Sequence, residues 1–167
     1  TSCVMLSGES AAGKYPVESV RTMAEIAEYT ENHMDYVTRF RNTPYTGENN
    51  LDKLSHAVCS MALDVDAKAI VVNSVSGKTA MLVSRFRTPV NIVGMTIDPK
   101  IWRRLSMSWG VTPVLAEEFP NMEVMFYFAK KETAKVLGLQ KGDNLIITGG
   151  PVHRGLGNTN TIKIETV

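Results

Sequence analysis

Short apolar runs alternate with amphipathic segments through most of this chain, and that alternation constrains its fold more than any other feature. The runs are residues 69–72, 90–95, 111–115 and 145–147, and the segments between them have helical spacing. A helix that returns the chain across a sheet leaves the next strand parallel to the previous one. The pattern therefore predicts an α/β fold whose mostly parallel sheet is covered by helices on both faces.

The C-terminal segment predicts one strand of a different kind. Residues 161–167 alternate with period two, as expected for a strand at the edge of a sheet. The Gly-rich connection that precedes them is too short for a helical crossover, so this strand should run antiparallel to the fourth. The complete prediction is a three-layer α/β/α domain with a five-stranded sheet and one antiparallel edge strand.

Helix and linker signals divide the rest of the chain. Asn121 and Gly138 are predicted to begin and end one helix as its N-cap and C-terminal glycine. Residues 1–6 form an apolar run typical of a buried strand, and residues 16–40 have the apolar spacing of a single helix. The polar segment 41–50, which contains a proline and a glycine, is the best candidate for a linker.

Charge and composition exclude several functions. The chain has 18 basic and 17 acidic side chains, a net charge of +1, and no block of like charges, so we expect neither nucleic acid nor an anionic membrane as a partner. No apolar run approaches the roughly 20 residues that a membrane span needs. Cys3 and Cys59 are predicted to be reduced and buried, no Cys or His spacing indicates a metal site, and we expect a cytoplasmic location.

The loop after the first predicted sheet strand is a candidate phosphate site. It contains Ser74, Ser76, Gly77, Lys78 and Thr79. A helix that begins here would present free backbone N–H groups and a favourable dipole, and glycine would allow close approach of an anion. The alternative is an ordinary capped turn with polar side chains in water. A nucleotide-hydrolysing P-loop is excluded, because valine occupies position 72, where that motif needs glycine.

A second Gly-rich loop, residues 149–159, leaves the fourth predicted strand. It contains His153, Arg154, Gly155 and Gly157, and two of these side chains can hold an anion. Ligands of open α/β sheets lie beyond the carboxyl ends of the strands, so the two loops could face one another. The alternative is a flexible hairpin loop without a ligand.

Three stretches of the chain resemble the pyruvate kinase family. Residues 4–16 are similar to the signature of the last strand-helix unit of that family's catalytic barrel. Residues 74–79 resemble its phosphate-binding loop, and residues 141–161 resemble its C-terminal hairpin. The resemblance implies that residues 1–43 are a remnant of the barrel and that residues 44–167 are the regulatory and assembly domain.

The resemblance also implies a division of labour. In the family, the barrel binds phosphoenolpyruvate, ADP, magnesium and usually potassium, and transfers the phosphoryl group to ADP. Its metal ligands and cationic clamp lie on earlier strands, so only Ser7 and Glu9 at the end of the last strand correspond to catalytic sequence here. Because barrel chemistry uses several strand ends at once, we expect this chain to bind no metal and to be inactive alone.

For the regulatory domain, the resemblance implies an effector phosphate on residues 74–79, closure by the loop around Gly155, and a tetramer in the parent enzyme. Members that bind fructose 1,6-bisphosphate commonly place a basic residue near the helix after the third strand. Here residues 117–125 are acidic instead and would repel a second phosphate. A monophosphorylated effector, or none, therefore fits better.

The N-terminal residues carry two further expectations. A barrel strand without its neighbours leaves backbone groups unpaired, so residues 1–15 should be disordered or paired with another copy of the chain. A chain that begins with Thr1 rather than methionine suggests an excised fragment, with the rest of pyruvate kinase as its partner. The competing hypothesis is a stand-alone phospho-ligand sensor or interaction module with the same α/β architecture.

Overall fold

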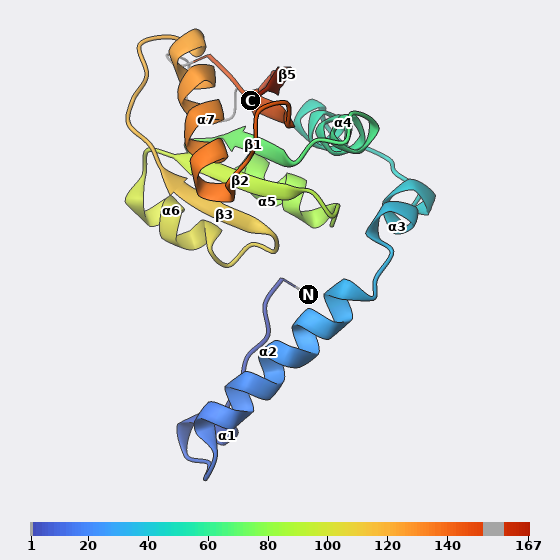
Figure 1. The fold of residues 1–167 in the computed structure, drawn as a ribbon, viewed down its shortest axis with the longest axis vertical. Coiled ribbons are helices and arrows are strands. Elements are labelled where there is room, and N and C mark those ends of the chain that lie inside the picture. Colours follow the sequence, from blue (N-terminus) through green and yellow to red (C-terminus); the bar gives the residue numbers. More distant parts are fainter. Residues whose placement is uncertain (1, 152–158) are drawn as a thin grey trace.

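The computed structural model describes residues 2–151 and 159–167. The N-terminal part contains three helices, and the remainder alternates helix and strand (Figure 1). The elements are α1 (Gly8–Ala11), α2 (Pro16–Asn32), α3 (Tyr36–Asn42), α4 (Asn50–Asp64), β1 (Ala69–Asn73), α5 (Lys78–Arg85), β2 (Asn91–Thr96), α6 (Pro99–Leu105), β3 (Val111–Leu115), α7 (Met122–Leu137), β4 (Asn144–Gly149) and β5 (Thr161–Thr166).

The five strands form one sheet in the order β3-β2-β1-β4-β5. β1 pairs in parallel with both β2 and β4, and β2 pairs in parallel with β3. β5 pairs antiparallel with β4, with Ile146 opposite Ile164. The predicted mostly parallel sheet with one antiparallel edge strand is confirmed.

Two apolar cores lie on opposite faces of this sheet. Alternate residues of the central strands divide between them, because successive side chains point to opposite faces. Ile70 and Ile146 pack with residues of α4, α5 and α6, whereas Val71 and Ile147 pack with residues of α7. The result is a three-layer arrangement, as predicted, with α7 alone supplying the helical part of the second core among the described residues.

The helix caps expected from the sequence are confirmed. The Asn121 side chain accepts a hydrogen bond from the backbone N–H of Val124 at 2.9 Å, and α7 begins at the next residue after the cap. Gly138 follows the helix with φ 66°, a left-handed conformation that glycine adopts without steric cost.

The segment 16–40 is two helices, so the prediction of a single helix is wrong. α2 ends at Asn32, and Asp35 caps α3 by accepting a hydrogen bond from the backbone N–H of Thr38 at 2.9 Å. Apolar spacing continues through the break, and the local cap at Asp35 overrides it.

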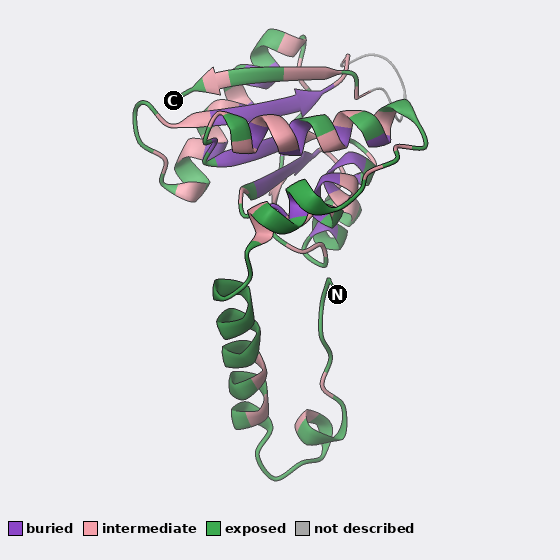
Figure 2. Ribbon diagram, turned by 90° about the vertical axis from the view of Figure 1, so that its right-hand side faces the viewer, coloured by how far each residue is buried: buried purple, intermediate pink, exposed green. Residues whose placement is uncertain are grey.

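The expectation of a strand at residues 1–6 is also wrong for the residues described. Residues 2–7 have no assigned secondary structure, and α1 follows them directly. α2 has no buried residue and projects from the α/β layers together with the N-terminal segment (Figures 1 and 2). An isolated segment here has no neighbouring strand to satisfy its backbone hydrogen bonds, which a strand requires. Cys3 is accordingly exposed, contrary to prediction, whereas Cys59 is buried.

Candidate functional site

The order of strands creates a switch point at the carboxyl edge of the sheet. β1 lies between β2 and β4, and the chain leaves β1 toward β2 but leaves β4 toward β5. Two loops that depart in opposite directions leave a crevice between them, where open α/β sheets bind ligands. The loops in question are residues 74–77 and the connection after Gly149, as predicted from the sequence.

The loop after β1 is held by backbone contacts to β2 and its following residues. Ser74 N–H donates to the carbonyl of Met95 at 2.9 Å, and the Val75 carbonyl accepts from the Thr96 hydroxyl at 3.2 Å. Ser76 Oγ lies 3.4 Å from the backbone nitrogen of Lys78, at the first residue of α5. Lys78 itself is exposed, so its ammonium group is available to solvent or to a ligand.

Gly77 is required by this geometry. It is buried and precedes α5 in a left-handed conformation with φ 73°. A Cβ at this position would lie 2.8 Å from Cγ2 of Ile101 and 3.2 Å from Cδ2 of Leu105, both on α6. The start of α5 therefore packs directly on α6, and no larger residue fits without movement.

Thr79 joins the two predicted loops. Its hydroxyl oxygen lies 2.9 Å from that of Thr159, and the Thr79 side chain is buried. Asn160 then donates its backbone N–H to the carbonyl of Gly149 at 3.0 Å, where β4 ends. The structure thus brings the loop after β1 and the end of the hairpin loop together, which the sequence predicted only as a possibility of topology.

Asn73 is a polar residue of the crevice that the sequence analysis missed. It ends β1, and its Nδ2 is buried without a hydrogen-bond partner among the residues described. A Cβ on Gly149 would lie 3.3 Å from Cβ of Asn73, so the ends of β1 and β4 are closely packed here. A polar residue that closes an otherwise apolar run was the available signal.

The other predicted site residues are not part of the described crevice. His153, Arg154, Gly155 and Gly157 fall outside the described residues. Ser7 precedes α1, and Glu9 lies within that helix, at the far end of the projecting N-terminal part (Figure 1). The backbone N–H groups of Glu9 and Ser7 hydrogen-bond the Glu9 carboxylate and lower its pKa.

The acidic segment 117–125 borders the same edge of the sheet. A Cβ on Gly149 would lie 3.0 Å from Cε of Met125, which places the first turns of α7 beside the end of β4. Glu117, Glu118 and Glu123 are exposed. Their negative charge is the feature from which the sequence analysis argued against a second phosphate.

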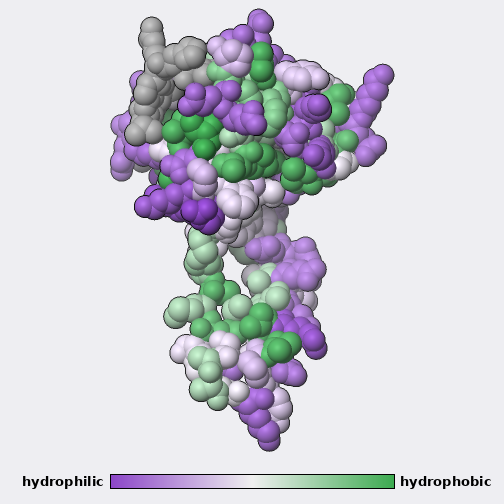
Figure 3. All heavy atoms as spheres, turned by 90° about the vertical axis from the view of Figure 1, so that its left-hand side faces the viewer, coloured by the Kyte–Doolittle hydropathy of each residue, from purple (hydrophilic) through white to green (hydrophobic). Residues whose placement is uncertain are grey.

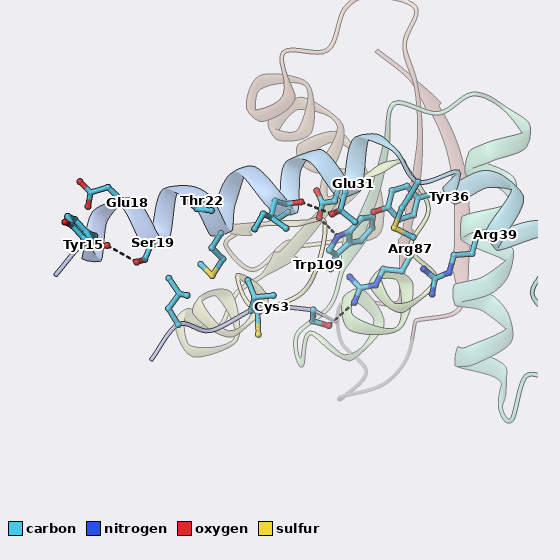
Figure 4. A pocket seen from close by; sticks show the side chains of 18 residues that line it. Cys3, Tyr15, Glu18, Ser19, Thr22, Glu31, Tyr36, Arg39, Arg87 and Trp109 are labelled. Carbon is cyan, nitrogen blue, oxygen red and sulfur yellow. Dashed lines mark hydrogen bonds between the residues drawn. The ribbon is translucent and has the colours of Figure 1, made fainter. Parts of the chain in front are cut away.

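The projecting helix α2 contacts the α/β layers through an aromatic and ionic cluster that sequence reasoning did not find. Trp109 Nε1 donates to Glu31 Oε1 at 2.8 Å, and its ring lies 5.3 Å from that of Tyr36 (Figure 4). The guanidinium of Arg87 lies 4.8 Å from the Trp109 ring centre, a cation–π contact. These residues come from distant parts of the sequence, so no local motif predicts their contact.

An apolar groove of about 1100 Å³ runs between α2 and the N-terminal segment. Met23, Ile26 and Met34 of the helix and its C-terminal extension line it, together with Val4 and Leu6. Hydrophobic side chains are visible along this projecting part in Figure 3. Large exposed apolar surfaces are typical of contact regions.

Metal ligands and membrane helices were sought in the described part of the chain. Within residues 2–151 and 159–167, no three His, Cys, Asp or Glu side chains lie together so that they could hold a metal ion. None of the helices in those ranges is long and apolar enough to cross a bilayer.

The fold and the crevice together define the structural class of this domain. This is a three-layer α/β/α domain whose hydroxyl-rich loop meets a Gly-rich connection at the topological switch point. The chain belongs to the pyruvate kinase family: the family profile described as "Pyruvate kinase, alpha/beta domain" matches residues 52–165.

Similar curated proteins agree with this assignment. The chain is 35% identical over 169 residues to a pyruvate kinase of Clostridium acetobutylicum, of which it covers 36%. It is 38% identical over 167 residues to a pyruvate kinase of Lactococcus lactis, of which it covers 33%, and 38% identical over 173 residues to that of Lactobacillus delbrueckii, of which it covers 29%. All of this chain is matched in each comparison, but it spans only about a third of those relatives' length.

Proposed function

We propose that this chain is the C-terminal, regulatory and assembly part of a pyruvate kinase. The parent enzyme would transfer a phosphoryl group from phosphoenolpyruvate to ADP and yield pyruvate and ATP, in the cytoplasm. The chain itself would bind a phosphorylated effector and contribute to a homo-oligomer, a tetramer in the parent. The family membership of residues 52–165 supports the parent reaction.

One observation supports effector binding above the others: the loop Ser74–Thr79 begins α5 at the switch point of the sheet and touches the second loop through the Thr79–Thr159 contact. A phosphate here would meet the N-terminal dipole of α5, the hydroxyls of Ser74 and Ser76, and the exposed Lys78. His153, Arg154, Gly155 and Gly157 would close over the rest of the effector.

The exposed carboxylates at the start of α7 support a monophosphorylated effector rather than fructose 1,6-bisphosphate. Glu117 and Glu118 are exposed just before α7, and Glu123 is exposed in its first turn. Like charges at short range weaken binding, and no basic residue occurs in 117–125 to offset them.

The chain alone should have no pyruvate kinase activity. Ser7 and Glu9 are exposed at the far end of the projecting N-terminal part, and barrel chemistry needs several strand ends at once. Magnesium and potassium would be bound by the rest of the parent enzyme, since the resemblance to the family implies that the metal ligands lie on earlier barrel strands. No catalytic step is assigned to this chain.

The apolar groove along α2 supports a role in assembly. The exposed side chains of Val20 and Ile26 lie on a helix that has no buried residue. Covering such a surface with the rest of the parent chain would be favourable by about 25 cal/mol for each Å² removed from water.

Calorimetry tests the effector site. Ribose 5-phosphate and AMP should bind the 1–167 chain more tightly than fructose 1,6-bisphosphate. Lys78→Ala should weaken the binding about tenfold, the loss expected for one charge-assisted contact, whereas Lys131→Ala at an exposed position of α7 should leave it unchanged. Tight binding of fructose 1,6-bisphosphate would refute the preference, and equal effects of the two lysine variants would refute the site.

A coupled assay tests the inactive state. The chain is incubated with phosphoenolpyruvate, ADP, magnesium and potassium, and pyruvate is followed through lactate dehydrogenase. We expect no turnover above a preparation from cells carrying the empty vector. Turnover that co-purifies with the 1–167 chain would overturn the proposal.

A further inference from the structure

A second cavity, away from the loop after β1, is lined by four arginines. It has a volume of about 480 Å³ and lies between α3, α5, α6 and the loop that follows α6. Arg39, Arg85, Arg87 and Arg104 line it, and Ser2 of the N-terminal segment, Ser84 and Ser108 are also in its wall. No acidic residue is among the described residues that form its wall.

Helix dipoles account for only part of this arrangement. Arg39, Arg85 and Arg104 lie in the last turns of α3, α5 and α6, where a cation is favoured by the partial negative charge of the helix end. That effect explains a cation on each helix, but it does not explain why three helix ends and Arg87 converge on one cavity. About half a negative charge from each helix end still leaves the cavity positive.

Two of the four cavity arginines have no ionic partner among the residues that the structure describes. Arg85 pairs with the buried carboxylate of Asp52, which lies outside the cavity wall. The guanidinium groups of Arg39 and Arg104 have no hydrogen bond or ion pair with any residue that the structure describes. Partial burial lowers the pKa of Arg87 and the Arg39 cation acts in the same direction, whereas Tyr36 and Glu31 act in the opposite direction. Arg87 also donates a hydrogen bond to the Ser2 hydroxyl at 3.1 Å.

Arg87 lies directly after Phe86, the residue that caps the C-terminus of α5. Its φ is 54°, in the left-handed region that non-glycine residues seldom adopt. The conformation directs the side chain onto the Trp109 ring, beside Arg39 in Figure 4. The Arg87 N–H donates to the Ser84 carbonyl at 3.1 Å, so this conformation ends α5 and sets where the Arg87 side chain leaves the helix.

We propose that this arginine cavity binds a small anion carrying two or more phosphate groups. Guanidinium groups match phosphate oxygens in bidentate geometry, and several of them around one cavity match a polyanion rather than a single charge. The volume lies within the range of about 300–1000 Å³ that small-molecule sites occupy. The site is distinct from the loop at Ser74–Thr79, and it therefore does not depend on the proposed effector.

The position of the cavity suggests what a bound ligand would do to the structure. It bridges α3, which follows α2, to α5, whose first residues adjoin the loop after β1. A polyanion bound to Arg39 and Arg104 would hold the projecting N-terminal helices against the α/β layers.

Pyrophosphate is the probe, and titration calorimetry of the 1–167 chain is the measurement. To remove any contribution from the loop after β1, the experiment is done in both the unmodified chain and the Lys78→Ala chain. Arg39→Ala and Arg104→Ala should each weaken pyrophosphate binding about tenfold in both backgrounds. Arg41→Ala and Arg103→Ala are charge-matched controls that should have no effect, because neither side chain lines the cavity.

Three results would overturn the proposal. The first is an equal loss of pyrophosphate affinity in the cavity variants and in their controls, or an equal calorimetric signal when sodium chloride of the same ionic strength replaces pyrophosphate. Either result indicates nonspecific charge screening. The second is binding that disappears with Lys78→Ala alone. The third is self-association in sedimentation velocity that Arg104→Ala abolishes and pyrophosphate competes, since this would assign the arginines to a protein contact.

Discussion

Gly77→Ala tests whether the start of α5 is packed on α6 as tightly as the structure indicates. Alanine at φ 73° costs about 1–2 kcal/mol in conformational energy. Its methyl group would also lie 2.8 Å from Cγ2 of Ile101, a β-branched side chain that cannot rotate away freely in a helix. Overpacking of this kind costs about 1–3 kcal/mol, so we expect Gly77→Ala to destabilise the chain by about 2–5 kcal/mol.

Gly138→Ala is the matched control. Gly138 has φ 66°, but nothing in the described part of the chain lies within 4 Å of a Cβ at that position, so only the conformational cost of about 1–2 kcal/mol applies. Urea unfolding followed by circular dichroism gives both free energies of unfolding on the 1–167 chain. The excess loss in Gly77→Ala over Gly138→Ala measures the steric part.

A double-mutant cycle isolates the contact itself. In an Ile101→Ala background the methyl group added by Gly77→Ala would have room, so most of the excess should disappear. Equal destabilisation by the two glycine substitutions, or an unchanged excess in the Ile101→Ala background, would refute the packing argument. A neutral Gly77→Ala would refute the left-handed conformation as well.

Three further predictions concern buried and charged side chains. Asp52→Asn should lower the free energy of unfolding by about 1–3 kcal/mol, because the buried carboxylate accepts a charge-assisted hydrogen bond. Burial raises the pKa of the Cys59 thiol to about 12, so under native conditions at pH 8 an aromatic disulfide reagent should modify Cys3 rapidly and Cys59 only after unfolding. The hydrogen bond from Lys163 lowers the pKa of Glu165 below 4.5; stability should therefore fall as pH drops below about 4.5, and less steeply in Glu165→Gln.

Each of these predictions has its own contrary result. Asp64→Asn is the control for the buried carboxylate of Asp52, since the Arg41–Asp64 pair is exposed on both sides and should contribute about 0–1 kcal/mol. An equal loss of unfolding free energy in Asp64→Asn and Asp52→Asn would contradict the Asp52 prediction. Labelling of both Cys3 and Cys59 under native conditions would contradict the cysteine prediction. Stability falls with falling pH because the unfolded chain binds more protons than the folded chain near pH 4. Identical acid-unfolding profiles for the unmodified chain and Glu165→Gln would contradict the Glu165 prediction.

Local signals were read correctly where a few adjacent residues decide the conformation. Asn121 and Gly138 cap α7 through contacts within a single turn, and both were predicted. The break between α2 and α3 was missed because apolar spacing continues through it, with no proline or glycine to mark the end. Its cause, the cap at Asp35, is equally local, so a closer reading of that aspartate could have found it.

One candidate site was predictable from local sequence, and the other was not. The loop at Ser74–Thr79 was predicted from its own composition, and its contact with Thr159 joins residues 80 apart. The arginine cavity collects side chains from α3, α5 and α6, and each of them separately resembles an ordinary cation at a helix end. Nothing in the spacing of those arginines distinguishes convergence from dispersal over the surface.

By itself, then, the sequence determined the order and type of the elements of the α/β domain, the antiparallel last strand and the loop most suited to an anion. These follow from periodicity, caps and turns, which act over a few neighbouring residues. Only the tertiary structure decided that β1 lies between β2 and β4, that residues 2–6 form no strand, and that four arginines share one cavity. The physical reason is that strand pairing and charge convergence depend on the hydrogen bonds and distances between segments remote in the chain.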